Sequence, residues 1–308
     1  MSARLVSLPC ALTVAGSDPD GGAGIQADLK TFSALGVYGA TVLTCITVQN
    51  TREFLYTYPL PPELVRDQIR VLSTDLNLRA AKTGMLFSKE LVSVVSKELK
   101  RLGLKLVVDP VVSAKTGGKL LGKEALKLLK EELIPIATVT TPNAEEASLL
   151  TGVKVKTVED AKKAAKTIAE MGSKCVVVKG GHLSTDKCVD VVYIEGSFKL
   201  LEGERVKGGG VHGTGCIFSA AITAGLALGM GTLEAIKLAK EVVSLAILFG
   251  VDVGLGFKPA NPMAKLYRDA EKYVVLECLS KAVRKLEENK QVTSLIPEVS
   301  SNLSLIHI

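Results

Sequence analysis

Hydrophobic positions along the chain alternate between short β-branched runs and longer stretches in which apolar residues recur three and four positions apart. The short runs predict buried strands, because strands covered on both faces are almost continuously apolar. They cover residues 11–15, 41–48, 80–83, 105–109, 138–140, 175–179 and 189–194. The longer stretches predict amphipathic helices over residues 62–76, 88–102, 122–133 and 158–171. This alternation predicts an α/β fold with a mostly parallel sheet covered by helices on both faces.

Residues that follow the strands are the first candidates for a functional site, since ligands of such sheets bind beyond the carboxyl ends of the strands. After Gly256 the pattern changes: KPANP interrupts the chain, residues 263–290 have the composition of one charged helix, and a tail follows. We therefore expect one large domain over residues 1–262, a charged C-terminal helix over 263–290 and a tail over 291–308.

Composition narrows the classes of function. The 308 residues are 47% apolar and 23% charged, which is typical of a globular protein with a sizeable core. The net charge of +6 is spread over many lysines, so we expect anionic small molecules as ligands and no nucleic-acid partner. The six cysteines form no CxxC pair, which disfavours a zinc site or a disulfide framework and suits the cytoplasm.

Two apolar segments need to be separated from targeting and membrane signals. The N-terminal stretch MSARLVSLPCALTVAG has no convincing cleavage site and leads directly into a predicted strand, so we interpret it as mature protein. The uncharged run 211–232 contains Gly, Thr and Ser and lacks a Leu/Ile-rich middle, which favours a buried helix. We therefore expect no membrane partner.

The first glycine-rich loop, GSDPDGGAG over residues 16–24, follows a strand and precedes a helix that begins near Ile25. Glycines let the backbone approach a ligand, and a helix N-terminus favours negative charge. Residues 22–27 also fit a relaxed dinucleotide-binding pattern, which requires an acidic residue at the end of the next strand. That strand ends in Gln49 and Asn50 instead, which disfavours a nicotinamide cofactor. A structural turn remains an alternative.

A second glycine-rich segment, GGKLLGKE over residues 117–124, satisfies the GxxxxGK pattern of a phosphate-binding loop. It has Glu124 where that loop needs Ser or Thr to bind magnesium, and it lies far beyond the strand that ends at Asp109. We interpret it as a surface turn with solvated lysines.

The third loop, GGGVHGTGC over residues 208–216, is followed by the helix sequence IFSAAITAGLALG. Several consecutive backbone N–H groups at the start of a helix would converge on an anion whose charge grows during a reaction. Cys216 lies in the first turn, where a thiol pKa is typically lowered; a small buried core residue is the alternative. His212 precedes it by four residues, which suggests a Cys–His pair or a metal site, but two such residues are too few for a zinc site.

Three segments together resemble the hydroxymethylpyrimidine and phosphomethylpyrimidine kinase family of the ribokinase-like superfamily. They are ALTVAGSDPDGGAGIQADLKTFSALGVYGATVLTCITVQNT, then VVDPVVSAKTGGKLL with TPNAEEASLLTG, and GGGVHGTGCIFSAAITAGLALG. The likeness extends from about residue 10 to about residue 262. Sugar kinases of this superfamily normally carry Asp where Cys216 stands, so the HGTGC loop separates the two groups.

The resemblance implies a three-layer α/β/α fold, a kinase domain over residues 1–262, and a homodimer. It also implies Mg²⁺ and ATP as cofactors. The implied reaction in thiamine biosynthesis is phosphorylation of 4-amino-5-hydroxymethyl-2-methylpyrimidine, followed by phosphorylation of the resulting monophosphate. A small pyrimidine is therefore the expected substrate.

The family's functional positions carry over residue by residue. The substrate-binding positions are Gly16, Asp28, Gln49 and Met85; the anion hole is Gly213, Thr214 and Gly215, and Cys216 matches the catalytic base. Asn143 and Glu146 match a magnesium–water site, Lys179 matches an ATP-phosphate contact, and Asp109 is a further candidate for magnesium or substrate.

Each of these positions has a structural alternative. Asp28 could be a solvated helix residue, Gln49 could simply end its strand and Met85 could belong to the core. Asn143 and Glu146 follow Pro142, so a helix cap competes with the magnesium role, and both can hold together. Lysines at strand ends such as Lys179 are common.

The C-terminal part departs from the single-domain pattern. In some relatives the kinase is fused to a thiamine-phosphate synthase domain, and SLIPEVSSN over residues 294–302 resembles the beginning of such a domain. We expect the tail to be the start of a truncated synthase domain.

Other functions remain open beside the kinase. Cys216 could be a true nucleophile of a transferase or hydrolase, which covalent labelling by substrate would reveal. A non-catalytic sensor would bind ligand without consuming ATP. Within the kinases, a pyridoxal kinase is the nearest alternative because its substrate is also a hydroxymethyl-bearing aromatic ring, but Gln49 and the GSDPDGGAG loop favour the pyrimidine.

Overall fold

The computed structural model describes residues 6–112, 121–182, 187–205 and 211–288. Contacts between Cα atoms divide the chain into two compact units, Met1–Ala264 and Lys265–Ile308. The tail over residues 291–308, and with it the expected synthase-like segment, lies outside the described residues. The assignment of domains therefore stays a prediction.

The described residues of the first unit form one sheet of nine strands in the order β3-β2-β1-β4-β5-β6-β7-β8-β9. The six strands from β2 to β7 along this order are parallel, whereas β3, β8 and β9 pair antiparallel with their neighbours. The strands are β1 (Cys10–Ser17), β2 (Tyr38–Gln49), β3 (Phe54–Pro59), β4 (Leu78–Thr83), β5 (Lys105–Val108), β6 (Val139–Thr140), β7 (Cys175–Val178), β8 (Cys188–Ile194) and β9 (Ser197–Gly203). The mostly parallel sheet predicted from the sequence is confirmed.

The pattern of apolar residues missed the two outermost strands, β3 and β9. Both lie at an edge of the sheet, and most of their side chains are exposed or half-buried. An edge strand with a solvated face needs no continuous apolar run, so its sequence lacks the signal that marked the inner strands.

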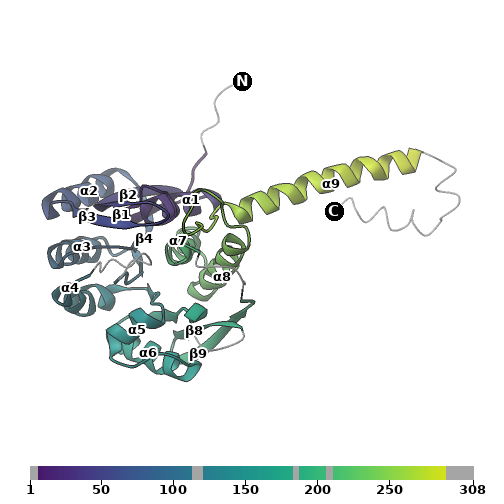
Figure 1. Cartoon of the computed structure of the whole chain (residues 1–308). Helices are drawn as coiled ribbons and strands as arrows, with labels where there is room; N and C mark the ends of the chain where they lie inside the picture. Colours follow the sequence, from purple (N-terminus) through teal and green to yellow (C-terminus); the bar gives the residue numbers. More distant parts are fainter. Residues whose placement is uncertain (1–5, 113–120, 183–186, 206–210, 289–308) are drawn as a thin grey trace. The chain divides into compact units, whose positions relative to one another are not determined.

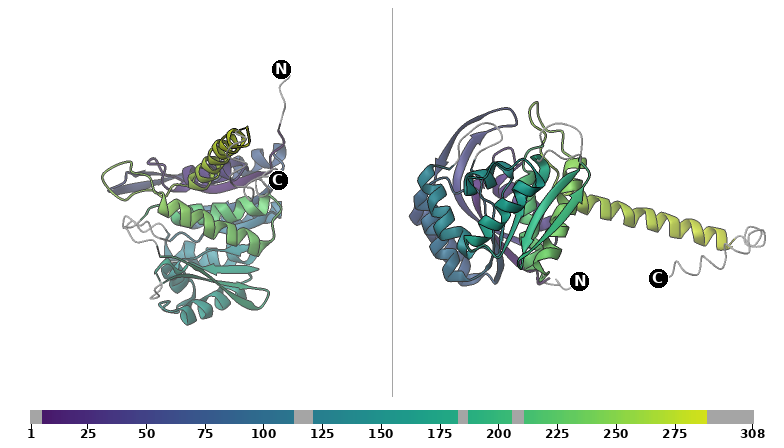
Figure 2. Two further views of the ribbon diagram at one scale, coloured as in Figure 1. Left: turned by 90° about the vertical axis from the view of Figure 1, so that its right-hand side faces the viewer. Right: turned by 90° about the horizontal axis from the view of Figure 1, so that it is seen from below.

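Helices cover both faces of the sheet and make the fold three-layered (Figures 1 and 2). One hydrophobic core contains the buried faces of α2, α3, α4, α5 and α6, and a second contains those of α1, α7 and α8. Their bounds are α1 (Gly24–Ala34), α2 (Pro62–Asp75), α3 (Lys89–Leu102), α4 (Lys123–Leu128), α5 (Ala144–Thr151), α6 (Val158–Glu170), α7 (Thr214–Ala227) and α8 (Thr232–Leu248). The helix predicted over residues 122–133 changes to a π-helical turn at Leu129–Leu133.

Local sequence signals explain where several helices begin and end. Ser88 Oγ accepts a hydrogen bond from the Leu91 N–H at the start of α3, and the helix stops at Gly103, whose φ of 63° favours glycine. The helix α7 is different, since its residues from Ile217 to Ala227 are all buried. Its uniformly apolar sequence is therefore that of an interior helix.

Among the described residues, no helix is both long enough and apolar enough to cross a membrane. The second unit consists, as far as it is described, of most of α9 (Ala264–Glu288). Ion pairs four residues apart, such as Lys265–Asp269 and Lys281–Glu277, run along this helix and support it locally.

Candidate active site

A cavity of about 370 Å³ lies beyond the carboxyl ends of the parallel strands. Its walls come from segments far apart in the sequence: the glycine loop after β1, the end of β2, and the residues that follow β4, β5, β6 and β7. The start of α7 closes it. All but one of the predicted site residues line this cavity, namely Gly16, Gln49, Met85, Asp109, Asn143, Glu146, Lys179, Gly213, Thr214, Gly215 and Cys216.

The first and third glycine loops pack directly against each other. Gly213 has a φ of 84°, and a Cβ added to it would lie 1.7 Å from the carbonyl oxygen of Gly22. A Cβ on Gly24, whose φ is 57°, would lie 2.4 Å from the carbonyl oxygen of Gly16. Only glycine fits these two positions. Gly213 lets the third loop approach the first, and Gly24 lets the first loop fold closely on itself.

The loop at residues 213–216 forms the start of α7. Gly213 is the N-cap of this helix, no side chain caps it, and the backbone ladder begins with the Ile217 N–H bonded to the Gly213 carbonyl. The N–H groups of Thr214 and Gly215 precede this ladder, where a helix attracts anions. The Cβ position of Gly215 lies 3.3 Å from Lys179 Nζ. Backbone donors and a cation therefore lie next to each other at the cavity.

The Cys216 thiol differs from the expectation. Burial, with a smaller contribution from the carboxylates of Asp28 and Asp109, raises its pKa to about 12, against the lowering effects of Lys82 and the Gly24 backbone. The predicted lowering of the thiol pKa is therefore wrong. A helix N-terminus stabilises a thiolate only modestly, and here desolvation outweighs it.

Asp28 is the predicted substrate residue that does not line the cavity. Its side chain is fully buried: Oδ1 lies 2.7 Å from Lys82 Nζ, and Oδ2 accepts a 2.6 Å hydrogen bond from Thr13 Oγ1. Burial alone would lower the pKa of Lys82, but the nearby Asp28 raises it, so the lysine is a cation. The structure thus corrects the expectation, because both oxygens of Asp28 are engaged behind the cavity wall.

Asp109 and Lys179 form a second lysine–aspartate pair, which borders the cavity. Lys179 Nζ lies 3.0 Å from Asp109 Oδ1, and Thr141 Oγ1 donates to the same oxygen at 3.1 Å. Burial would lower the pKa of Lys179, but Asp109 and Glu146 raise it. A protonated lysine beside the N–H groups of α7 is suited to bind phosphate.

Asn143 and Glu146 form the helix cap that was the alternative to their magnesium role, and they also line the cavity. Asn143 Oδ1 accepts from the Glu146 N–H at 2.9 Å, and Glu146 Oε2 accepts from the Asn143 N–H at 2.7 Å. Burial raises the pKa of Glu146 to about 7, against the lowering effect of Lys179. The Asp109, Asn143 and Glu146 oxygens are the hard donors that Mg²⁺ prefers, so the residues fit this ion.

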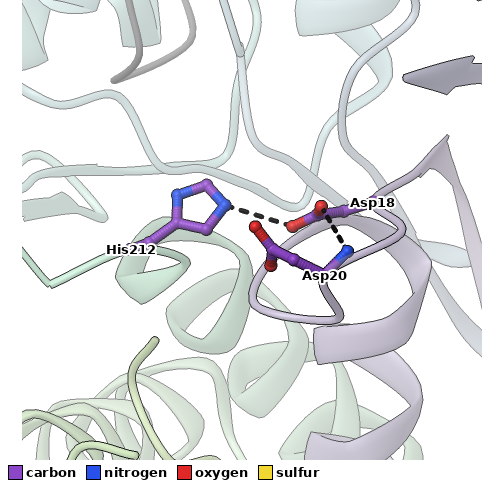
Figure 3. Close-up of side chains that lie close together, drawn as sticks. All are labelled: Asp18, Asp20 and His212. Atoms are coloured by element: carbon purple, nitrogen blue, oxygen red, sulfur yellow. Dashed lines mark hydrogen bonds and ion pairs between the residues drawn. The ribbon is translucent and has the colours of Figure 1, made fainter. Parts of the chain in front are cut away.

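Asp18, Asp20 and His212 form a cluster that the sequence did not single out (Figure 3). Their ligating atoms all lie within 4.8 Å of one another, the spacing of a possible cation site. Asp18 Oδ2, however, already accepts from the Ala23 N–H at 2.7 Å and pairs with His212 Nε2 at 3.1 Å. We assign no metal to the cluster, and His212 pairs with Asp18 where the sequence had suggested Cys216. The one signal for Asp18 was its place directly after β1.

A third ion pair lines the cavity near β8. Lys240 Nζ lies 2.7 Å from Asp190 Oδ2, and Asp190 Oδ1 accepts from the Gly180 N–H at 2.7 Å. The apolar side chains of Val243 and Ile247 line the cavity as well. No local pattern marked Asp190 and Lys240, because they lie 50 residues apart in the sequence.

Comparison with known proteins decides the family. The family model described as phosphomethylpyrimidine kinase matches residues 18–261, most of the chain. The chain belongs to this family. The hydroxymethylpyrimidine/phosphomethylpyrimidine kinase of Rhizobium meliloti is 42% identical over 262 residues, which cover 84% of this chain and 98% of that protein. The resemblance inferred from the three glycine-loop segments is confirmed.

A longer relative of this kinase family is the thiamine biosynthesis bifunctional protein of Geobacter sulfurreducens. It is 42% identical over 251 residues, which cover 81% of this chain and 51% of that protein. The chain therefore spans about half the length of that relative.

Solved structures of two kinds of kinase share the fold. A Bacillus subtilis pyridoxal kinase in complex with ADP has a TM-score of 0.79 and 41% identity, covering 84% of this chain and 98% of that chain. A phosphomethylpyrimidine kinase from Clostridium difficile 630 has a TM-score of 0.69 and 42% identity, covering 77% and 99%. The expected ribokinase-like, three-layer architecture of this kinase is confirmed.

Proposed function

We propose that this kinase transfers the γ-phosphoryl group of ATP to 4-amino-5-hydroxymethyl-2-methylpyrimidine and then phosphorylates the monophosphate, in thiamine biosynthesis. One observation carries the proposal: a single cavity brings Gln49, Gly16 and Met85 together with the backbone donors at Gly213–Gly215 and Lys179. The first group suits an aminopyrimidine ring and the second suits a phosphate under transfer.

The proposed chemistry is mainly positioning and charge neutralisation, as phosphoryl transfer requires. The substrate oxygen forms a bond to the γ-phosphorus while the bond to the leaving ADP oxygen breaks. The N–H groups of Thr214 and Gly215 and the Lys179 ammonium stabilise the negative charge on the transferred group. In the first step, the Cys216 thiolate takes the hydroxyl proton and becomes a thiol, and the buried cation of Lys82 favours the thiolate from which this transfer starts.

Asp109, Asn143 and Glu146 would hold Mg²⁺ in this proposal. When bound, the ion supplies positive charge that offsets the charge of the nucleotide phosphates. The pKa of Glu146 is about 7, and a bound cation would lower it, because a nearby positive charge favours the ionised carboxylate. Glu146 would therefore become fully ionised when Mg²⁺ binds.

Pyridoxal kinase activity is the second candidate, since the solved structures that resemble this chain include pyridoxal kinases from Bacillus subtilis and Staphylococcus aureus. Both substrates should be offered to the purified protein with Mg-ATP while ATP consumption and product masses are measured. We expect the pyrimidine diphosphate. Phosphorylated pyridoxal alone would overturn the substrate proposal and leave the family membership intact.

We also propose a cytosolic homodimer. All six cysteines are free, as expected in a reducing compartment. The edge of the sheet at β2 and β3 exposes apolar side chains that a second copy would cover, and these are Tyr38, Ile46, Leu55, Tyr56 and Tyr58. Light scattering at working concentration should give twice the monomer mass, and substitution of Tyr56 and Tyr58 by Lys should give monomers.

A further inference from the structure

We propose that Asp18 is a positioning residue which fixes the side-chain amide of Gln49, so that the Gln49 carbonyl oxygen faces the substrate. The site would then select a ring that carries a hydrogen-bond donor, such as an amino group, over a ring that carries only an acceptor at the same place. This inference rests on the proposed function, because it takes Gln49 to be a substrate contact. It adds the residue that sets the direction of this contact.

Both carboxylate oxygens of Asp18 have hydrogen-bond donors within the protein. The residue is almost fully buried, with 4% of its side chain exposed. Its Oδ2 is taken by the Ala23 N–H at 2.7 Å and by His212 Nε2 at 3.1 Å. Its Oδ1 accepts from Gln49 Nε2 at 2.6 Å, the shortest hydrogen bond in this group, and from the Asp20 N–H at 3.2 Å.

The chemistry of the two side chains carries the second step. An ionised carboxylate accepts hydrogen bonds and donates none, so only the NH₂ end of the Gln49 amide can face Asp18. The hydrogen bonds from His212 and Gln49 outweigh burial and lower the pKa of Asp18, which keeps the carboxylate ionised. Within the described residues, no protein donor reaches Gln49 Oε1, and Gln49 lines the cavity. The oxygen is therefore the end of the amide left to accept from a ligand.

Substituting Asp18 by Asn predicts a specific change of geometry. The bond from the Ala23 N–H to Oδ2, at 2.7 Å, is shorter than the bond from the Asp20 N–H to Oδ1, at 3.2 Å. Keeping the shorter bond requires an oxygen at the position of Oδ2, so the new NH₂ group should occupy the position of Oδ1. That group faces Gln49, and two NH₂ groups cannot bond to each other. The Gln49 amide would then turn over, accept from residue 18, and present its own NH₂ group to the ligand.

The experiment compares two ligands, the natural 4-amino pyrimidine and its analogue with a 4-methoxy group, which can only accept. Equilibrium binding and kcat/KM are measured for both with the full-length protein. We expect the wild type to prefer the amino compound by at least about tenfold, and the difference should lie in KM. With the methoxy analogue, the hydrogen bond to Gln49 Oε1 is lost and two acceptor oxygens face each other instead. Asp18→Asn should lower this preference by about tenfold or invert it, while KM for ATP stays within about twofold.

Three controls separate Asp18 acting through Gln49 from other effects. Asp20→Asn removes a neighbouring carboxylate whose Oδ1 accepts from the Gly22 N–H, and it should leave the amino-to-methoxy ratio unchanged. Gln49→Met should abolish the preference. Adding Asp18→Asn to Gln49→Met should then change the ratio no further, because coupled residues are not additive.

Asp18→Ser, whose hydroxyl can donate or accept, should give an intermediate ratio and serves if Asp18→Asn does not fold. Retention of the wild-type ratio in a folded Asp18 variant would overturn the inference alone. A wild type that binds the methoxy analogue as well as the amino compound would also overturn it. A wild type that binds neither pyrimidine would overturn the proposed function together with the inference.

Discussion

Two lysine–aspartate pairs lie near the ends of the strands, and they differ in what surrounds them. Lys82 and Asp28 are 2.7 Å apart, and neither side chain has any exposed surface. Lys179 and Asp109 are 3.0 Å apart, and 17% of the Lys179 side chain is exposed at the cavity. The same two residue types therefore form an enclosed pair behind the cavity wall and an open pair that lines the cavity.

The difference shows why a charged residue near a glycine loop is not necessarily a ligand contact. The carboxylate of Asp28 has its hydrogen bonds satisfied by Lys82 and Thr13, and a substrate would have to displace them. The ammonium of Lys179 has one aspartate partner and a free approach from the cavity. Desolvation is costly for both pairs, but only the open pair can recover part of that cost when an anion binds.

Both pairs affect the pKa of the Cys216 thiol. Lys82 lowers its pKa, while Asp28 and Asp109 raise it. The cation of the enclosed pair and the carboxylate of the open pair therefore act in opposite directions on the same thiol. A substitution in either pair should therefore also change the pKa of the Cys216 thiol.

Breaking the enclosed pair should have the largest effect. Lys82→Met leaves Asp28 as an uncompensated buried charge, which typically costs about 3–5 kcal/mol of the free energy of unfolding. Urea denaturation measures this loss. The matched double variant, Asp28→Leu with Lys82→Met, removes both charges and should recover most of it. A loss below about 1 kcal/mol in the single variant would mean that water reaches Asp28.

Breaking the open pair should affect turnover more than stability. Lys179→Met removes a cation from the place where phosphoryl charge develops, and loss of such a donor typically lowers kcat by about 10²–10³-fold. Asp109 keeps Thr141 as a partner, so the free energy of unfolding should fall by less than in Lys82→Met. Lys89→Met, at an exposed pair with Glu124, is the matched surface control. Near-normal kcat in Lys179→Met would remove the residue from the proposed mechanism.

Much of the fold and the cavity could be predicted because their signals are local. Glycines that need positive φ, apolar runs and the residues after each strand are all visible in neighbouring positions. The seven inner strands and eleven cavity residues followed from such signals and the resemblance. The edge strands β3 and β9 were missed because solvated faces leave no apolar run.

The features that were missed depend on contacts between distant positions. Asp28 meets Lys82 across 54 positions, and Asp18 meets His212 across 194. The position of Cys216 in the first turn of a helix predicted a lowered thiol pKa, but burial among other segments raises the pKa instead. Local pattern identifies which residues reach the site, whereas burial and partners, which are set by tertiary packing, decide what each can do there.

Cys216→Ala tests the role of the thiol whose pKa both pairs affect. If the thiol accepts the substrate proton, its loss should lower kcat by about a hundredfold, the lower part of the range for general-base catalysis, because the raised pKa of the thiol leaves little thiolate at neutral pH. KM should change little. Cys216→Asp should restore part of the loss, limited by repulsion from Asp28 and Asp109. Normal turnover in Cys216→Ala would leave the backbone donors and Lys179 to stabilise the transferred group without a protein base.

The smallest expected effect is on the chemical reactivity of Cys216. A pKa near 12 leaves about one thiol in 10⁴ as thiolate at pH 8, and only the thiolate reacts with iodoacetamide. The exposed Cys278 should therefore be labelled first, and labelling of Cys216 should accelerate about tenfold per pH unit above pH 8. Peptide mass spectrometry after timed labelling distinguishes the two, with Cys216→Ala as the assignment control. Lys82→Met should slow the Cys216 reaction further, since it removes the cation that lowers the thiol pKa. Labelling of Cys216 before Cys278 at pH 8 would instead mean that the helix N-terminus lowers the pKa of the Cys216 thiol by more than burial and the neighbouring carboxylates raise it.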